Sequence, residues 1–249
     1  MVRERTHHWR DVEAFTRACE DISSIDDLWK ALDWIVRRIG FAWFALIDPS
    51  NPGFKTTGCM PLVSFPEAWR EEYIREQFYR DDPARHASAN CVLGICWHRV
   101  GETASLSRRQ RHILQRARCH GLMSGFTMHV RMPGEPAAAF SVGRPSETPV
   151  TARESSAIRL TGLTIFEHAR RLRSGPGTDR VALSRRQIDC IALVAQGKSD
   201  WEISRILGLS RDTVHEYIEA ARRRCGVHRR TQLVLRAIHD GYLTYDTVL

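Results

Sequence analysis

Residues 199–214 decide the fold of the C-terminal part of the chain, and they read Ser-Asp-Trp-Glu-Ile-Ser-Arg-Ile-Leu-Gly-Leu-Ser-Arg-Asp-Thr-Val. Gly208 is suited to end one short helix, and Ser210 is a preferred N-cap residue for the next. Two helices separated by only Gly208-Leu-Ser210 are typical of a helix-turn-helix motif. We expect one small core between these helices, built from the apolar side chains Ile203, Ile206, Leu207, Val214 and Ile218.

This motif lies in a segment for which the sequence predicts helices alone. Four short helices are expected, and a glycine follows each of them. Their predicted ranges are Ser184–Gln196, Asp200–Leu207, Arg211–Cys225 and Thr231–Asp240. The sequence therefore predicts an all-α, four-helix domain over residues 181–249.

A linker is expected at residues 174–180, where a Gly-Pro-Gly run cannot continue the helix before it. That helix is predicted to begin after the N-cap Thr151, with Glu154 as its capping-box partner. It carries apolar residues at seven-residue spacing, namely Ile158, Ile165 and Leu172. Such a stripe fits packing on its own domain and packing on a second subunit equally well.

Residues 1–173 are expected to form one α+β domain. Helices are predicted over Asp11–Ile22, Ser24–Ile39, Pro66–Phe78 and Leu106–His120. Strands are predicted over Phe41–Ile47, Gly125–Met132 and Ala138–Gly143. Helices grouped around a mostly antiparallel sheet predict an α/β/α sandwich.

The composition is that of a globular protein, because 43% of the 249 residues are apolar and 27% are charged. The longest unbroken apolar run, Phe41–Ile47, is far shorter than the roughly 20 residues of a membrane-spanning helix. Residues 1–8 do not resemble a secretory signal. The seven cysteines are scattered and odd in number, which favours reduced thiols over a disulfide scaffold. We therefore expect a cytoplasmic protein with no membrane partner.

The charge favours a polyanionic partner, nucleic acid first. The net charge is +8, and between Ile203 and His239 there are eight arginines but only three acidic residues. A solvated basic surface is the alternative interpretation. The outward face of the second motif helix is expected to carry Arg211, Asp212, His215, Glu216 and Glu219, where such helices enter a major groove. The arginines at 222–224, 229 and 230 follow, placed to neutralise phosphates.

The C-terminal segments resemble, in order and spacing, the helix-turn-helix domain of LuxR-type transcription regulators. The matching segments are Leu183–Gln187, Ala195–Lys198, Glu202–Ser210, Thr213-Val214 and Gly226-Val227. Gln187, Tyr217 and Cys225 stand where the family usually has glutamate, histidine and leucine. The resemblance implies that DNA is contacted by Ser210, Arg211, Thr213, His215, Glu219, Arg222, Arg223 and Arg229. His215 and Glu219 would read bases, with Glu219 accepting from a cytosine amine or, alternatively, only lowering the affinity.

The N-terminal part contains a group of aromatic side chains and one carboxylate. Trp69, Tyr73, Asp82 and Trp97 fall within 29 residues. A pocket for an amphiphilic ligand uses such residues, because aromatics supply apolar walls with polar handles and a carboxylate anchors an amide N–H. Aromatics at this spacing are also common in hydrophobic cores.

This spacing resembles the acyl-homoserine-lactone-binding domain of quorum-sensing LuxR-type receptors, and Gly121–Gly125 resembles a glycine-spaced segment of that family. The resemblance implies that Trp69 donates to the lactone carbonyl and that Asp82 accepts from the ligand amide. It implies that Tyr73 and Ser141 contact the acyl amide region and that Trp97 forms the pocket wall beside the lactone ring. Phe65 stands where a tyrosine is frequent and cannot hydrogen-bond an acyl carbonyl, and His129 stands where proline is frequent. Acyl-chain preference is therefore left open.

Other functions fit the sequence less well. A zinc site at Cys91, Cys96 and His98, with Cys119 and His120 nearby, lacks a recognised Cys-x2-Cys pair. Ser141 and His129 on neighbouring strands are not accompanied by an activated-serine signature, so an enzyme is not expected. The βα alternation of a response-regulator receiver domain is absent from the predicted elements.

The sequence therefore predicts a ligand-responsive transcription regulator that binds promoter DNA as a homodimer. Its ligand is expected to be an N-acyl-homoserine lactone, with no cofactor and no metal. RNA polymerase is expected as a further partner. The alternative is a regulator of the same architecture that senses another small molecule or acts without a ligand.

Overall fold

A computed structural model of the chain describes residues 7–47, 62–103, 105–132, 138–174 and 181–244. These residues fall into two compact units, residues 7–131 with 138–174 and residues 181–244. Among the described residues, no helix combines the length and the apolar character that crossing a membrane requires.

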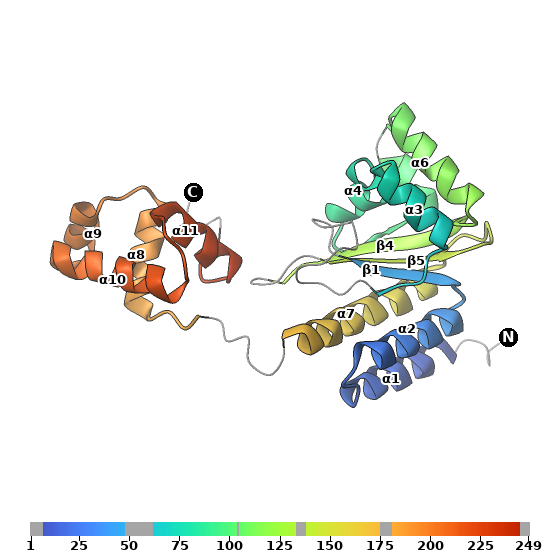
Figure 1. Cartoon of the computed structure of the whole chain (residues 1–249), viewed down its shortest axis with the longest axis horizontal. Helices are drawn as coiled ribbons and strands as arrows, with labels where there is room; N and C mark the ends of the chain where they lie inside the picture. The colour runs from blue at the N-terminus through green and yellow to red at the C-terminus, as the bar shows by residue number, and fades with distance from the viewer. Residues whose placement is uncertain (1–6, 48–61, 104, 133–137, 175–180, 245–249) are drawn as a thin grey trace. The chain divides into compact units, whose positions relative to one another are not determined.

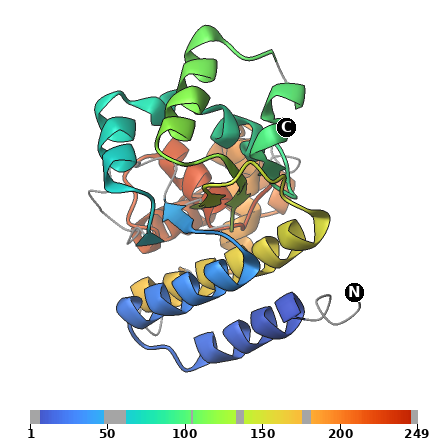
Figure 2. The same ribbon diagram turned by 90° about the vertical axis from the view of Figure 1, so that its right-hand side faces the viewer.

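The first unit has three layers around one antiparallel sheet (Figure 1). The strands follow the order β2-β1-β5-β4-β3, with β1 Trp43–Ile47, β2 Leu62–Val63, β3 Ile95–Cys96, β4 Ser124–Val130 and β5 Ala138–Arg144. One face is covered by α1 His7–Glu20, α2 Ile25–Ile39 and α7 Ala152–Ser174, as Figure 2 shows from a second direction. The other face carries α3 Glu67–Arg75, α4 Pro83–Ala89 and α6 Arg108–Cys119. The predicted α/β/α sandwich is confirmed.

The two faces of the sheet carry side chains of different size. The face toward α2 and α7 is packed with large apolar residues, among them Phe44, Leu46, Phe126, Met128, Phe140 and Val142. On the other face, Trp43, Ile47 and His129 are large, but most positions in the middle of the sheet are small or short, namely Ala45, Gly125, Thr127, Ala139, Ser141 and Gly143. Because side chains alternate between the faces of a strand, this pattern leaves a dense core on one side and space on the other.

Most predicted helices are present, and their ends have identifiable causes. The Ser24 side chain accepts from the Asp27 N–H at 3.1 Å and begins α2, and Gly40 ends it at a φ of 106°. The single helix predicted over Pro66–Phe78 is wrong. The structure ends α3 at Arg75, because Gln77 adopts a left-handed φ of 53°, and a short 3-10 helix, η2 Phe78–Arg80, follows.

The apolar stripe of α7 packs within its own domain. Ile158 and Ile165 are buried in the core shared by α1, α2 and the sheet, and Leu172 is partly buried against it. Of the two interpretations of this stripe, the structure supports packing on the same chain.

The second unit is the predicted bundle of four helices, α8 Arg185–Ala195, α9 Asp200–Leu207, α10 Arg211–Arg224 and α11 Arg230–His239. Ile203, Val214 and Ile218 are buried in its core and Leu207 is partly buried, as expected. The expectation for Ile206 is wrong, because 55% of this residue is exposed. Gly208 turns the chain between α9 and α10 at a φ of 65°, a conformation that favours glycine. Of the predicted linker only Ser174 is described, as the last residue of α7.

Candidate ligand pocket and DNA-binding surface

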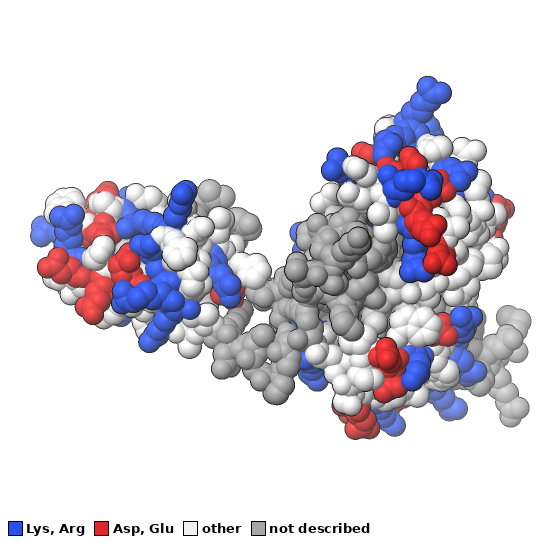
Figure 3. Space-filling model, viewed as in Figure 1, with Lys and Arg blue, Asp and Glu red and all other residues white. Residues whose placement is uncertain are grey.

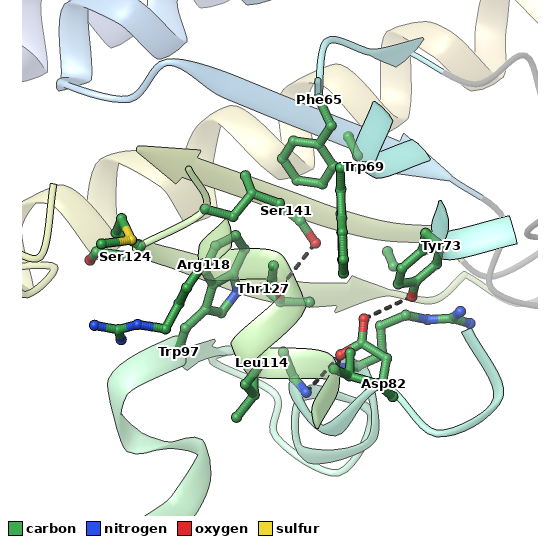
Figure 4. Close-up of a pocket in the computed structure, with 18 of the residues that line it drawn as sticks. Phe65, Trp69, Tyr73, Asp82, Trp97, Leu114, Arg118, Ser124, Thr127 and Ser141 are labelled. Carbon is green, nitrogen blue, oxygen red and sulfur yellow. Dashed lines mark hydrogen bonds between the residues drawn. The ribbon is translucent and has the colours of Figure 1, made fainter. Parts of the chain in front are cut away.

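A cavity of about 200 Å³ lies between the small-residue face of the sheet and helices α3, α4 and α6. The six residues named from the sequence all line it: Phe65, Trp69, Tyr73, Asp82, Trp97 and Ser141 (Figure 4). They come from separate parts of the unit, since Trp69 and Tyr73 lie on α3, Asp82 precedes α4 and Ser141 lies on β5. The fold therefore gathers them around one space.

Asp82 accepts hydrogen bonds from three groups that fix its carboxylate. One oxygen, Oδ1, accepts from the Ala84 N–H at 2.9 Å and the Arg85 N–H at 3.3 Å, so Asp82 is the N-cap of α4. The other, Oδ2, accepts from the Tyr73 hydroxyl at 2.7 Å. Burial, and then the Asp82 charge, raise the pKa of Tyr73 well above its usual value, so the tyrosine keeps its proton. An oxygen with two lone pairs and one bonded hydroxyl has room for one more N–H donor.

The two tryptophans differ in what their indole N–H groups do. Trp97 donates to the Thr127 hydroxyl at 2.9 Å, and the Thr127 oxygen lies 3.0 Å from that of Ser141. Trp69 has no hydrogen-bond partner for its N–H among the described residues. Since an indole N–H only donates, Trp69 is left as a donor at the wall of the cavity, whereas Trp97 is already satisfied.

A pair of glycines makes room for the Trp97 ring. Gly125 and Gly143 stand opposite each other on β4 and β5. A Cβ on Gly125 would lie 2.6 Å from the Trp97 ring, and a Cβ on Gly143 would lie 3.0 Å from it. The ring therefore lies directly on the backbone of the sheet, and any larger residue at these positions would displace it.

Trp69 is held by a charged cluster behind it. Its ring packs against His120 with centroids 5.6 Å apart, and His120 Nε2 lies 2.7 Å from Glu72 Oε2. Arg116 donates to both oxygens of the buried Glu72, at 2.6 and 2.8 Å. The cluster joins α3 to α6 next to Trp69. Hydrogen bonds from Arg116 and His120 lower the pKa of Glu72 from its usual 4.5 to about 2.

Replacing Glu72 with glutamine should destabilise the first unit by about 1.5–3 kcal/mol at pH 7, the range for hydrogen bonds to a charged group. A carboxylate with a lowered folded-state pKa stabilises the fold above its unfolded value of 4.5, and it loses that effect as the pH falls toward 2. The difference in the free energy of unfolding between the wild type and Glu72→Gln should therefore shrink as the pH falls from 4.5 toward 2. Urea unfolding followed by tryptophan fluorescence measures it, because six of the seven tryptophans lie in the first unit. The exposed neighbour Glu71→Gln is the control, and equal losses for both variants would contradict the assignment.

Two alternatives considered from the sequence are placed differently by the structure. His129 Nδ1 lies 2.9 Å from the Ser88 hydroxyl, and Ser141 bonds Thr127, so His129 and Ser141 do not form a catalytic pair. His120, considered beside Cys119 for zinc, is bonded to Glu72 instead. Within the described ranges no cluster of three or more histidine, cysteine or acidic side chains is arranged to hold a metal.

The sequence did not single out some residues of the pocket. Thr127 bridges Trp97 and Ser141, and Arg70 and Arg85 line the wall beside Trp69 and Asp82. The signal for Thr127 was the alternation of small and large residues along β4 and β5. The two arginines carried no signal, since arginine is abundant throughout this chain.

In the second unit, the predicted recognition helix α10 begins at Arg211 and is capped by Ser210, whose side chain accepts from the Thr213 N–H at 3.0 Å. Its hydroxyl also lies 2.8 Å from that of Thr213, so both residues serve the cap. Arg211 and His215 are exposed. His215 Nδ1 lies 3.2 Å from Asp200 Oδ2 on α9, which fixes the ring and leaves its second nitrogen on the surface.

The arginines that follow the exposed start of α10 in the sequence do not all have the same role. Basic side chains are prominent on the visible face of the unit, mixed with acidic ones (Figure 3). Arg222 is bonded to Glu219 and to the His228 carbonyl, and Arg230 to Asp200 and the Lys198 carbonyl. Arg224 donates to the Ala182 carbonyl at 3.0 Å. Arg223 and Arg229 are exposed, and Arg223 has no side-chain partner among the described residues.

The structure also assigns a role to Gln187, which stands in place of a family glutamate. Its Oε1 accepts from the Ser184 N–H at 2.9 Å and completes the capping box of α8. The same oxygen lies 3.4 Å from Arg224 Nη1. The residue therefore serves both as a cap and as a helix contact. Cys225 is buried in the core of this unit, and Tyr217 packs against that core.

Comparison with known proteins gives the same two parts. Residues 24–170 match the autoinducer binding domain, and residues 181–237 match the luxR family of bacterial regulatory proteins. The chain is 28% identical to the transcriptional activator protein VanR of Vibrio anguillarum, over 90% of this chain and 94% of VanR. It is 28% identical to the quorum-sensing regulator RhlR of Pseudomonas aeruginosa, over 79% of this chain and 81% of RhlR.

Among solved structures, that of SdiA in complex with octanoyl-rac-glycerol has the same fold, with a TM-score of 0.69 and 20% identity. The match covers 95% of this chain and 96% of SdiA. The related proteins are transcription regulators and not enzymes. The autoinducer binding domain alone matches more than half of the chain, and the chain therefore belongs to the LuxR-type quorum-sensing regulators.

Proposed function

We propose that this regulator binds an N-acyl-homoserine lactone in the cavity of residues 1–173 and binds promoter DNA as a homodimer through residues 181–249. The observation that carries the ligand proposal is the set of groups around the cavity that can form a further hydrogen bond. Trp69 offers an N–H donor, Asp82 Oδ2 offers an acceptor, and the Ser141 hydroxyl lies on the cavity side of the sheet.

An N-acyl-homoserine lactone presents the complementary groups. Its amide N–H suits Asp82, its lactone carbonyl suits Trp69, and its amide carbonyl suits a hydroxyl donor. The acyl chain suits the apolar part of the wall, which includes Ile113, Leu114 and Leu122. A single molecule of this class satisfies each free group with a partner of the right kind, as buried polar groups require.

The DNA-binding proposal is supported by the exposed start of α10 and by Arg223 and Arg229 beyond it. A homodimer would place two recognition helices about one DNA turn apart, roughly 34 Å, and so bind two half-sites. The outer side of α7 exposes Leu160 and Leu163, an apolar surface that suits a second subunit. The regulator bound at a promoter would then contact RNA polymerase.

Ligand binding should raise the stability of the chain, because the ligand binds only the folded state. At about 100 times its dissociation constant, an N-acyl-homoserine lactone should add roughly 2.7 kcal/mol. Thermal unfolding against a panel of acyl lengths measures this effect, with the ring-opened N-acyl-homoserines as matched controls. A melting temperature that no lactone of the panel changes would overturn the proposal and favour a regulator that senses another small molecule or none.

A further inference from the structure

Three side chains on the floor of the cavity form a continuous chain of hydrogen bonds. Trp97 Nε1 lies 2.9 Å from Thr127 Oγ1, which lies 3.0 Å from Ser141 Oγ. Thr127 and Ser141 stand opposite each other on β4 and β5, so the register of the sheet fixes their separation. Figure 4 shows the Ser141 oxygen between Thr127 and Trp69, on the cavity side of the sheet.

The chemistry of the first residue sets the direction of this chain. An indole N–H only donates, so Thr127 must accept from Trp97. Thr127 is 2% exposed, and its hydroxyl proton has no acceptor among the described residues other than Ser141. If Ser141 donated to Thr127, the Thr127 proton would be buried without a partner, which is costly. Thr127 therefore donates to Ser141, and the Ser141 proton is left to point into the cavity.

The starting point of the chain is held firmly. The Trp97 ring lies on Gly125 and Gly143, where added Cβ atoms would come within 2.6 and 3.0 Å of it. The indole therefore has little freedom to turn its N–H away from Thr127. Phe65, which also lines the cavity, has no hydroxyl that could donate in place of Ser141.

We propose that Trp97 and Thr127 are positioning residues that make Ser141 an obligatory hydrogen-bond donor to the acyl carbonyl of the ligand. This inference rests on the proposed function and deepens it. A ligand that binds tightly carries a carbonyl oxygen within hydrogen-bond reach of the Ser141 hydroxyl. Thr127 touches no ligand carbonyl itself and affects the affinity through Ser141.

A double-mutant cycle tests the proposal. The measured quantity is the dissociation constant for the N-acyl-homoserine lactone that stabilises the wild type most. Thr127→Val keeps the shape and removes the hydroxyl, and Ser141→Ala removes the proposed donor. Each should weaken binding about 3- to 10-fold, the effect of one neutral hydrogen bond. The double variant should bind no more weakly than Ser141→Ala alone, because Thr127 acts only through Ser141.

Two further measurements separate this role from a merely structural one. The N-alkyl-homoserine lactone of equal chain length has no acyl carbonyl, so the wild type, Thr127→Val and Ser141→Ala should bind it equally. Thr127→Ser should restore binding of the acyl lactone to within about twofold of wild type, since it restores the hydroxyl. Thr161→Val is the matched control, because Thr161 is a fully buried threonine of α7 whose hydroxyl has no partner among the described residues, and it does not line the cavity.

The outcomes distinguish this inference from the function on which it rests. A wild type that binds no lactone would overturn the proposed function and the inference with it. If the wild type binds the lactone but the losses of affinity from the two substitutions multiply in the double variant, only the inference is overturned. If Thr127→Val does not fold, Thr127→Ala replaces it in the cycle, and equal losses for the acyl and alkyl lactones would again overturn the inference.

Discussion

Replacing Asp82 with asparagine is expected to weaken the response to the lactone by about 10- to 150-fold, which corresponds to the 1.5–3 kcal/mol of a charge-assisted hydrogen bond. Asparagine keeps one oxygen, which can still accept from the Ala84 and Arg85 N–H groups and cap α4. Its amide nitrogen replaces the oxygen that accepts from Tyr73. That nitrogen is a hydrogen-bond donor and would face the ligand N–H, which is also a donor, so no hydrogen bond could form between them. The loss should therefore appear in binding while the helix stays capped.

The neighbouring carboxylate offers a matched control for this substitution. Asp81 is bonded to Arg109 at 2.7 Å on the surface of the unit and does not line the cavity. Asp81→Asn should leave the dissociation constant for the lactone within about twofold of wild type, as surface pairs contribute little. A calorimetric titration of both variants, with unfolding curves recorded without ligand, is the measurement. Normal lactone affinity in Asp82→Asn would remove Asp82 from the site.

The sequence predicted the residues around the pocket better than it predicted their hydrogen bonds. Trp69, Tyr73, Asp82 and Trp97 stand out because large aromatics and a lone carboxylate are chemically distinctive at any position. Thr127 does not stand out, because threonine is an ordinary strand residue. Its importance depends on Trp97 and Ser141, which lie 30 positions before it and 14 after it. Such a contact follows from the order and register of the strands, which the sequence pattern did not specify.

The short elements show a second limit of sequence patterns. The two-residue strands β2 and β3 are too brief to have any periodicity, so neither was predicted. Ile206 lies at a spacing that fits the core of its helix equally well, yet the bundle closes on Ile203 and Ser204 and leaves it exposed. Helical spacing identifies which residues share a face. Which residues of that face are buried depends on where the neighbouring helices pack.

The clearest consequence of the structure for DNA binding concerns two adjacent arginines. The sequence assigns the same phosphate-neutralising role to Arg222 and Arg223. In the structure Arg222 is occupied by Glu219 and the His228 carbonyl, while Arg223 is exposed without a partner among the described residues. Arg223→Ala should therefore weaken binding to every duplex and lower the salt slope by about one unit. Arg222→Ala should mainly lower the stability of the second unit.

His215 is expected to act on sequence preference instead. Its ring is held by Asp200 and keeps one nitrogen on the outward face of α10, where a base edge is reached. His215→Ala should cost roughly 1–3 kcal/mol at a duplex selected by the wild type, and little at a scrambled duplex of the same composition. Gel-shift titrations across a salt series on both duplexes measure the two effects together. Because phosphate contacts carry no direct sequence information, a change of preference in Arg223→Ala with none in His215→Ala would place a different face of α10 in the groove.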